Sequence, residues 1–386
     1  MKKLTKILCT LLVAVMVLSS LAGCGGKANE AKDDGGIYIG GIGPLTGDYA
    51  NYGLSVKQGA EIAVKEINAN GGIAGMPITL DFQDSQGDPD SAVSAYGKLI
   101  DSGMDVSLGA VLSGETASVV AAAKNDGLLV LTPSGSSKDA IAGSDTSFRV
   151  CFNDPAQGAA SAEYIGENNL PKKVAVLYQS DIDYSVGLYE TFKATAPDYG
   201  IEILETQSFT DSTKTDFSTQ INAIQASGAE LVFIPIYAAE ASTFLTQAKG
   251  KLDGAIFFGC DGLDGILGKV SDPSIAENVM MLTPFAADST AENVQAFVKA
   301  YKEAYGAAPD QFAADAYDAI YAIKAAVEKS GKTPADKDFN SAVVTAMTEI
   351  TVEGVTGSMT WTADGETVKP AQAMIIHDGV AAVYEG

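Results

Sequence analysis

Residues that commonly carry acid–base and metal chemistry are scarce in this sequence. Its 386 residues include one histidine, His377, and one arginine, Arg149. A Ser-His-Asp triad or a histidine-based metal site would have to use His377 itself, which follows an apolar run and is more simply a structural residue. Neither a Gly-x-x-x-x-Gly-Lys phosphate loop nor a Gly-x-Ser-x-Gly nucleophile motif occurs. We therefore expect no enzyme, no cofactor and no metal site.

Positive charge is also in short supply. The chain has 25 lysines and arginines against 49 acidic residues, and its formal net charge is −24. Such a chain is repelled by phosphate backbones and by anionic lipid. This excludes nucleic acid as a partner.

The sequence holds only four cysteines. Cys9 and Cys24 lie in the N-terminal segment, whereas Cys151 and Cys260 lie in apolar strand patterns without metal-ligand spacing. We expect the last two to be buried thiols, although export from the cytoplasm would also permit a disulfide.

Near the N-terminus, residues 7–18 form an apolar run that follows three lysines and is too short for a typical membrane-spanning helix. The run leads to Leu-Ala-Gly-Cys24, which resembles a bacterial lipobox. We expect residues 1–23 to be a lipoprotein signal peptide, Cys24 to be lipidated, and the polar stretch 24–36 to be a flexible tether. A plain secretory peptide is the alternative. The lipid would be the only attachment of the chain to a membrane, and it would hold the protein on the outer side of the cytoplasmic membrane.

From residue 37 onward the apolar pattern alternates between strand and helix. The first series predicts strands at 37–43, 78–82, 105–112 and 128–132, with helices near 56–67, 90–102 and 115–125 between them. A second series predicts strands at 174–178, 201–205, 231–236, 255–260 and 279–283, with helices at 185–196, 216–227, 238–249 and near 264–270. Helices at 291–305, 311–330 and 339–349 follow. This pattern predicts an α/β fold with doubly wound parallel sheets.

Two breaks divide the series into two lobes. Asn153-Asp-Pro interrupts the first series, and Pro284 interrupts the second. We expect one lobe from 37–153 with 284–374, and another from 154–283 with 375–386. Three crossovers, near 153, 284 and 374, would then act as a hinge around a cleft.

Hydroxyl residues follow two of the predicted buried strands. The strand 128–132 ends at Pro133, and Ser134, Ser136 and Ser137 come next, while Ser113 follows the strand 105–112. Ligands of parallel α/β sheets bind at the carboxyl ends of strands, where hydroxyls and free N–H groups can hold a small carboxylate. The alternative is that these serines only cap helices.

Acidic residues after strands leave an enzyme as an alternative. Asp181, Asp183 and Asp261 each follow a predicted strand of the second series. A glycosidase needs two carboxylates facing each other across a sugar, but no spacing here specifies such a pair. An isolated Asp after a strand is more often a turn residue.

Several segments together resemble a known family, the solute-binding lipoproteins of branched-chain amino-acid ABC transporters, with a type I periplasmic-binding-protein fold. The resemblance covers residue 37 to the C-terminus. Its markers are Gly43-Pro-Leu-Thr-Gly with Tyr52-Gly53, Glu66-Ile-Asn-Ala-Asn-Gly-Gly-Ile73, Leu131-Thr-Pro, Tyr184-Ser-Val-Gly187 and Asp216-Phe-Ser218.

This resemblance implies an α-amino-acid site at matching positions. Ser113 would bind the ligand carboxylate, Ser136 would reach both carboxylate and ammonium, and the backbone carbonyl of Ser134 would accept from the ammonium. Asp261 matches an acidic residue that pairs with the ammonium. Leucine-type binders commonly have Glu there, so the shorter Asp261 would contact the ligand directly or through water.

The same resemblance assigns roles to three tyrosines and to the partners. Tyr184 and Tyr237 would close over the ligand, and Tyr52 would line the first lobe; core packing is the alternative for each. The implied function is capture of leucine, isoleucine or valine by a monomer that delivers it to ABC transporter permease subunits. Relatives of this fold also bind amides, urea and small organic or aromatic acids, or serve as sensor domains. These functions are the alternatives to amino-acid binding.

Overall fold

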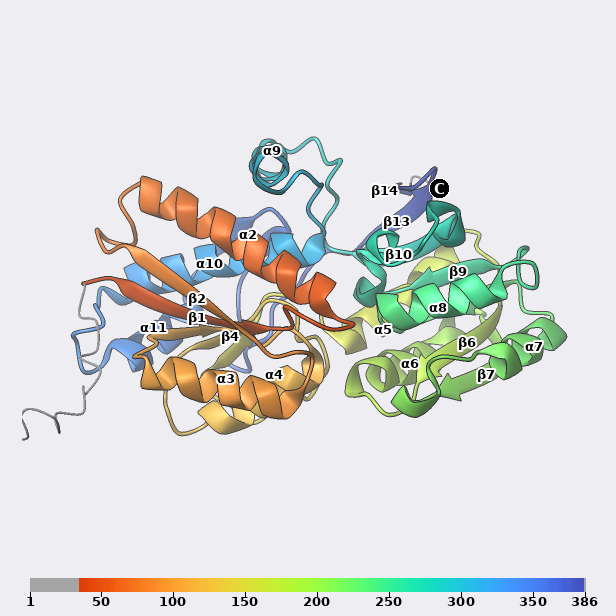
Figure 1. The fold of residues 1–386 in the computed structure, drawn as a ribbon, viewed down its shortest axis with the longest axis horizontal. Coiled ribbons are helices and arrows are strands. Elements are labelled where there is room, and N and C mark those ends of the chain that lie inside the picture. The colour runs from red at the N-terminus through yellow and green to blue at the C-terminus, as the bar shows by residue number, and fades with distance from the viewer. Residues whose placement is uncertain (1–34, 385–386) are drawn as a thin grey trace, which may run out of the picture. The chain divides into compact units, whose positions relative to one another are not determined.

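A computed structural model describes residues 35–384, which form two β-sheets covered by helices (Figure 1). The predicted signal peptide 1–23, Cys24 and all but the last two residues of the predicted tether lie outside the described residues. No helix within the described range is long and apolar enough to cross a membrane.

The first sheet has five strands in the order β2-β1-β3-β4-β5, all parallel. Its strands are β1 (Ile37–Gly43), β2 (Ile78–Asp84), β3 (Val106–Leu108), β4 (Val130–Thr132) and β5 (Ser147–Arg149). The order reverses beside β1, as in a doubly wound sheet. The predicted fold class is confirmed here.

Helices cover both faces of this sheet because side chains alternate along its strands. Ile37 and Ile39 join the core that includes helix α2, whereas Ile42 joins a separate core with α3 and α4. Figure 1 shows α2 and α10 over one face and α3 and α4 over the other. These helices are α2 (Ala50–Ala69), α3 (Pro89–Asp101), α4 (Ser113–Ala123) and α10 (Gln311–Ser330).

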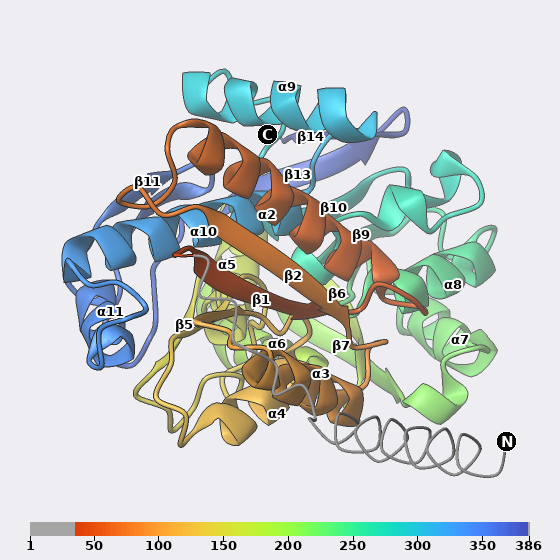
Figure 2. The same cartoon turned by 60° about the vertical axis from the view of Figure 1, so that its left-hand side comes forward.

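Two further helices extend this layer. Helix α9 (Glu292–Tyr305) contacts α2, and α11 (Phe339–Met347) packs on α10 (Figure 2). A short hairpin, β11 (Val352–Gly354) with β12 (Gly357–Met359), follows α11.

The second sheet has seven strands in the order β14-β13-β10-β9-β8-β6-β7. Its strands are β6 (Lys173–Gln179), β7 (Glu202–Phe209), β8 (Leu231–Phe233), β9 (Ile256–Gly259), β10 (Val279–Thr283), β13 (Gln372–His377) and β14 (Val380–Val383). The strands from β6 to β10 are parallel, but β13 and β14 pair antiparallel at one edge. This antiparallel edge is an addition to the predicted parallel sheet.

Helices also pack around the second sheet. They are α5 (Asp154–Glu167), α6 (Asp183–Thr195), α7 (Ser218–Ser227) and α8 (Ala238–Ala248). Helix α5 packs against α6, and α7 contacts α8. All three residues of β8 are buried, as expected of a strand covered on both faces.

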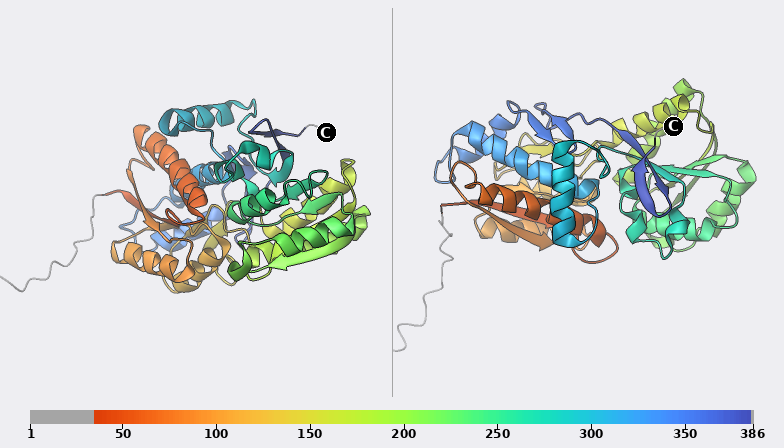
Figure 3. Two further views of the ribbon diagram at one scale, coloured as in Figure 1. Left: turned by 45° about the vertical axis from the view of Figure 1, so that its right-hand side comes forward. Right: turned by 90° about the horizontal axis from the view of Figure 1, so that it is seen from above.

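We call each sheet with the helices packed on it a lobe, the first and the second. The chain passes between the sheets after β5, after β10 and before β13 (Figure 3). The predicted limit at residue 374 falls inside β13, whose first residue, Gln372, already pairs with Thr283. We therefore propose the third crossing just before Gln372, and the limits at 153 and 284 stay predictions.

Several predicted elements are shorter than the apolar pattern suggested. The strand predicted at 105–112 ends at Leu108. Gly109 still donates its N–H to the Leu131 carbonyl (3.0 Å), but its φ of +127°, which favours glycine, turns the backbone away from the extended conformation. The helix predicted near 264–270 is instead a pair of 3₁₀ turns, 261–263 and 266–268.

Candidate functional site

The loops that follow β3 and β4 are joined by hydrogen bonds. Ser134 Oγ donates to the Val111 carbonyl (2.8 Å), and the Ser137 N–H donates to Ser113 Oγ (3.1 Å). Ser113, Ser134 and Ser136 are all buried. The structure thus brings the three predicted serines together at one edge of the first sheet, as adjacent parallel strands require.

Arg149, at the end of β5, fixes the backbone of the β4 loop. Its Nη1 donates to the carbonyls of Gly135 (2.9 Å) and Ser137 (3.0 Å). Its Nη2 lies 3.2 Å from Glu366 Oε1. Arg149 therefore has a structural role, because it supports the loop that presents Ser134 and Ser136.

Asp261 follows β9 in the second lobe and is held by a compact set of donors. The Tyr184 hydroxyl and the Gly262 N–H each donate to Asp261 Oδ1, both at 2.8 Å. The Asp261 N–H donates to Gln157 Oε1 (3.1 Å). Burial raises the pKa of Asp261 to about 6, against the opposing effect of hydrogen bonds from Tyr184, Gln157 and Gly262. Both of these hydrogen bonds from Tyr184 and Gly262 thus fall on Oδ1.

The two predicted second-lobe tyrosines form one aromatic wall. The rings of Tyr184 and Tyr237 are stacked with centroids 4.5 Å apart. Tyr52, on α2 of the first lobe, lies against this wall, 5.6 Å from the Tyr237 ring. Its hydroxyl donates to the Gly262 carbonyl (2.6 Å) and accepts from the Ala238 N–H (2.8 Å). Tyr52 therefore ties the lobes together at the site.

A cavity of about 10 Å³ remains where these groups meet. Its lining comes from both lobes and comprises Tyr52, Val111, Leu112, Ser134, Ser136, Tyr184, Tyr237, Asp261, Gly262 and Phe312. Of the seven predicted site residues, only Ser113 does not line it. A space of this size holds about one water molecule. An amino acid can therefore enter only if the lobes move apart.

The family of the chain follows from comparison with known proteins. A family model described as periplasmic binding protein matches residues 36–379. The chain belongs to this periplasmic binding protein family. The membership confirms the prediction of a binding protein rather than an enzyme.

Curated relatives of this binding protein are amino-acid binders by name. The Leu/Ile/Val-binding protein homolog 3 of Brucella melitensis is 32% identical over 355 residues, which cover 90% of this chain and 92% of that protein. The leucine-, isoleucine-, valine-, threonine- and alanine-binding protein of Pseudomonas aeruginosa is 27% identical over 325 residues, covering 84% of this chain and 85% of the other.

Solved structures show the same fold with different ligands. The branched-chain amino acid transporter substrate-binding protein LivJ of Streptococcus pneumoniae, in complex with isoleucine, has a TM-score of 0.82 and 28% identity, covering 90% of this chain and 99% of that one. A solute-binding protein of R. palustris in complex with benzoate has a TM-score of 0.81 at 21% identity, covering 90% and 95%. The second likeness supports the fold alone.

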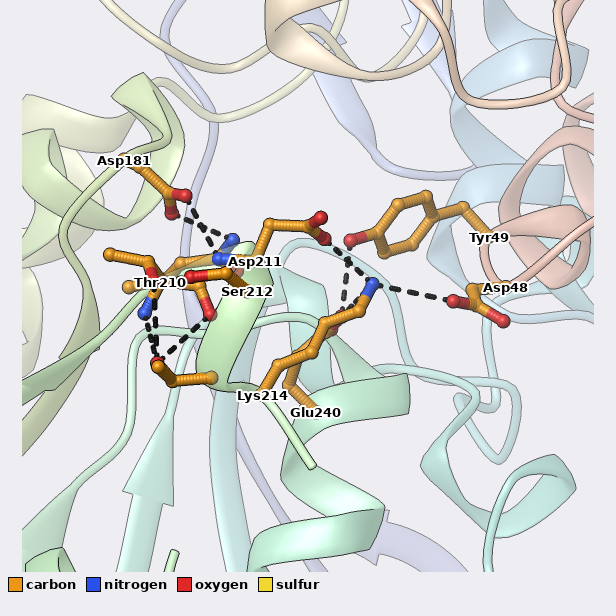
Figure 4. Close-up of polar contacts among 10 residues, drawn as sticks. Asp48, Tyr49, Asp181, Thr210, Asp211, Ser212, Lys214 and Glu240 are labelled. Atoms are coloured by element: carbon orange, nitrogen blue, oxygen red, sulfur yellow. Dashed lines mark hydrogen bonds and ion pairs between the residues drawn. The ribbon is translucent and has the colours of Figure 1, made fainter. Parts of the chain in front are cut away.

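Polar contacts at the rim of the cleft also join the lobes of the binding protein (Figure 4). Lys214 Nζ, from the second lobe, lies 3.3 Å from Asp48 Oδ2 of the first lobe and 3.5 Å from Glu240 Oε1. The Tyr49 hydroxyl donates to the same Glu240 oxygen (3.1 Å). Because Asp48 and Tyr49 precede α2 of the first lobe, the Lys214–Asp48 and Tyr49–Glu240 contacts exist only while the lobes are close, whereas Lys214–Glu240 lies within the second lobe.

Four cavity residues were missed by the sequence analysis: Val111, Leu112, Gly262 and Phe312. Phe312 is the second residue of α10, and its ring lies 4.8 Å from that of Tyr52. The helix itself was predicted correctly, but nothing in the local pattern says which turn of a buried helix faces a cleft. Gly262 could have been suspected, because it directly follows Asp261.

One group within the described range has metal-ligand atoms close together, namely Glu277, His377 and Asp378, within 4.8 Å of one another. Among them, His377 Nδ1 lies 2.5 Å from Glu277 Oε1. This hydrogen bond accounts for the closeness of the ring and the carboxylate, and none of the three residues lines the cavity, so we assign no metal to the group. Cys151 and Cys260 are free and buried, as predicted.

Proposed function

We propose that this protein captures a free amino acid with a branched aliphatic side chain in the cleft between its lobes. One observation carries the proposal: a single cavity joins the hydroxyl-bearing loops of the first lobe to the Asp261 carboxylate of the second. A zwitterion loses water at both charged ends on binding, so each end needs a charge-assisted partner. The first lobe supplies the donors for the ligand carboxylate, and the second lobe supplies the negative charge for the ammonium.

The carboxylate of the ligand would bind at the serines. Ser113 Oγ accepts from the Ser137 N–H, which leaves its own hydrogen free to donate. Ser136 would donate to the carboxylate and accept from the ammonium. The Ser134 hydroxyl already donates to the Val111 carbonyl, so we assign the backbone carbonyl of Ser134 to the ammonium.

The ammonium would also pair with Asp261, directly or through one water, at the oxygen that Tyr184 and Gly262 leave unused. The rings of Tyr52, Tyr184 and Tyr237 would surround the ligand's aliphatic part. These apolar faces suit leucine, isoleucine or valine, and the isoleucine-bound neighbour shows that the fold accommodates such a ligand.

We infer further that the protein works outside the cytoplasm as a monomer, held by lipid on Cys24, and delivers its ligand to the permease subunits of an ABC importer. The lipobox-like Leu-Ala-Gly-Cys24 supports the anchor. Replacing Cys24 with Ser should release the protein or leave its precursor unprocessed. A variant that stays processed and membrane-bound would refute the anchor.

A thermal-shift screen of the twenty amino acids, with urea, amides and benzoate, tests the function. A ligand at a thousand times its dissociation constant stabilises the fold by about 4 kcal/mol. We expect leucine, isoleucine or valine to give the largest shift. A shift with benzoate or urea alone would favour the runner-up, a binder of small acids or amides.

A further inference from the structure

We propose that Asp154 is a second carboxylate for the ligand's ammonium group, beside Asp261; this inference rests on the proposed function. Asp154 is the first residue of α5, and its side chain is completely buried. Neither of its carboxylate oxygens has a hydrogen-bond partner among the described residues. A buried carboxylate without a partner is costly, so such a group indicates a missing cation.

The position of Asp154 points to the ligand as that cation. Its N–H donates to the carbonyl of Ser136 (2.9 Å), the residue to which we assign both ends of the ligand. On another side, a Cβ placed on Gly187 would lie 3.8 Å from Asp154 Oδ2, which puts the carboxylate beside α6, one turn after Tyr184. Asp154 therefore lies between the Ser136 loop of the first lobe and α6 of the second.

The charges nearby agree with this placement. Burial raises the pKa of Asp154, and the charge of Asp261 raises it further, whereas the Ser136 hydroxyl and Arg149 lower it. Asp154 does not itself line the cavity, but its charge and that of Asp261 repel each other, and a cation between them would relieve both.

Two structural explanations for Asp154 are weaker. Arg149 already donates to the carbonyls of Gly135 and Ser137 and pairs with Glu366. Within the described range no ion pair joins it to Asp154. A helix N-terminus does favour an acidic residue, but that effect operates at the surface as well and needs no burial. Asn153 already caps α5 by accepting from the Ala156 N–H (2.9 Å).

A pair of carboxylates has a consequence for ligand class. A ligand with a carboxylate but no ammonium would leave Asp154 and Asp261 facing each other without a cation between them. The site should therefore select α-amino acids against carboxylic acids of the same shape. Leucine and 4-methylpentanoate, which lacks only the amino group, form the matched pair of probes.

Calorimetric titration of the full mature chain with both probes tests the role of Asp154. In Asp154→Asn, the affinity for leucine should fall about ten- to a hundredfold, while that for 4-methylpentanoate should stay the same or rise. Asp183→Asn is the control, because Asp183 is likewise the first residue of a helix but is exposed. It should leave both affinities unchanged.

The ratio of the two affinities separates recognition from structural support. Asp154→Ser, a smaller neutral variant, should lower this ratio as Asp154→Asn does. An unchanged ratio in both variants would overturn the inference, whether the affinities stay at wild-type values or fall together with a lower melting temperature. If the unmodified protein binds no amino acid at all, the proposed function itself is wrong.

Discussion

Among single residues, Asp261 is the one whose charge the proposed site depends on most. Its Oδ1 is held by Tyr184 and Gly262, so the carboxylate is preorganised before any ligand arrives. Asp261→Asn keeps the shape and turns a charge-assisted hydrogen bond into a neutral one. The loss should be about 1.5–3 kcal/mol, or about ten- to a hundredfold in leucine affinity.

Calorimetry and thermal melts check this prediction together. The melting temperature of the ligand-free variant should stay the same or rise, because a buried charge without a cation is gone. Unchanged leucine affinity would show that Asp261 is only a turn residue. Asp183→Asn again serves as the exposed control.

The pKa of Asp261 predicts a pH dependence of binding. Burial raises this pKa from 3.8 to about 6, so the ligand-free protein holds a proton on Asp261 below that value. Only the ionised form can pair with an ammonium, so the ionisation of Asp261 should make leucine binding about tenfold weaker at pH 5 than at pH 7.5. The stability of the ligand-free fold should change oppositely, falling as pH rises from about 4 to 6, because the unfolded chain ionises first.

Titrations of leucine at pH 7.5 and pH 5 test the first part of this profile, and the Asp261→Asn variant should flatten it. Equal affinities of the unmodified protein at the two pH values would contradict the assigned role of Asp261.

Single residues were predictable where local sequence carries a signal. Ser113, Ser134 and Ser136 follow buried strands, and parallel strands place such residues at one edge. Phe312 and Asp154 gave no such signal. Phe312 reaches the site because α10 packs beside α2, and the burial of Asp154 depends on how α5 lies against Ser136.

At the scale of elements, the packing of α2 on α10 depends on a glycine. A Cβ on Gly59 would lie 1.9 Å from the Ala313 carbonyl oxygen, a backbone atom that cannot turn aside. Gly59→Ala should therefore force the helices apart and cost about 1–3 kcal/mol of stability. This would shift Tyr52 and Phe312, which stand on the same two helices.

Gly97 in α3 provides the matched control, since nothing lies within 4 Å of a Cβ placed there. Gly97→Ala should stabilise the fold by about 0.5–1 kcal/mol, because alanine is the better helix former. Urea denaturation of both variants measures the difference. A Gly59→Ala variant as stable as the unmodified chain would show that the helices are not in close contact.

Most elements could be predicted from apolar periodicity, but their pairing could not. The helix predicted at 311–330 is α10 in full. By contrast, nothing in residues 372–383 indicates that the strands there add to the second sheet in antiparallel fashion. That choice depends on β10 being an open edge, which only the assembled sheet shows.

At the scale of the whole binding protein, we expect closure of the lobes to control ligand release. Lys214 contacts Asp48 of the first lobe only in the closed arrangement, while its contact with Glu240 lies within the second lobe. Lys214→Gln should weaken the closed form by about 0.5–1 kcal/mol. Leucine should then dissociate about two- to fivefold faster, with little change in association.

Stopped-flow displacement of bound leucine measures these rates. Lys173→Gln is the control, because Lys173 pairs with Glu230 inside the second lobe at 3.9 Å. Identical dissociation rates for Lys214→Gln and the control would show that the rim contacts do not hold the lobes together.

The central claim is that this protein binds an amino acid by both of its charged ends, one on each lobe. Calorimetry with leucine, leucinamide and 4-methylpentanoate tests it most directly, because each analogue lacks one charged end. We predict one saturable leucine site, and affinities at least about tenfold weaker for both analogues. No binding of leucine, or an analogue that binds as tightly as leucine, would contradict it.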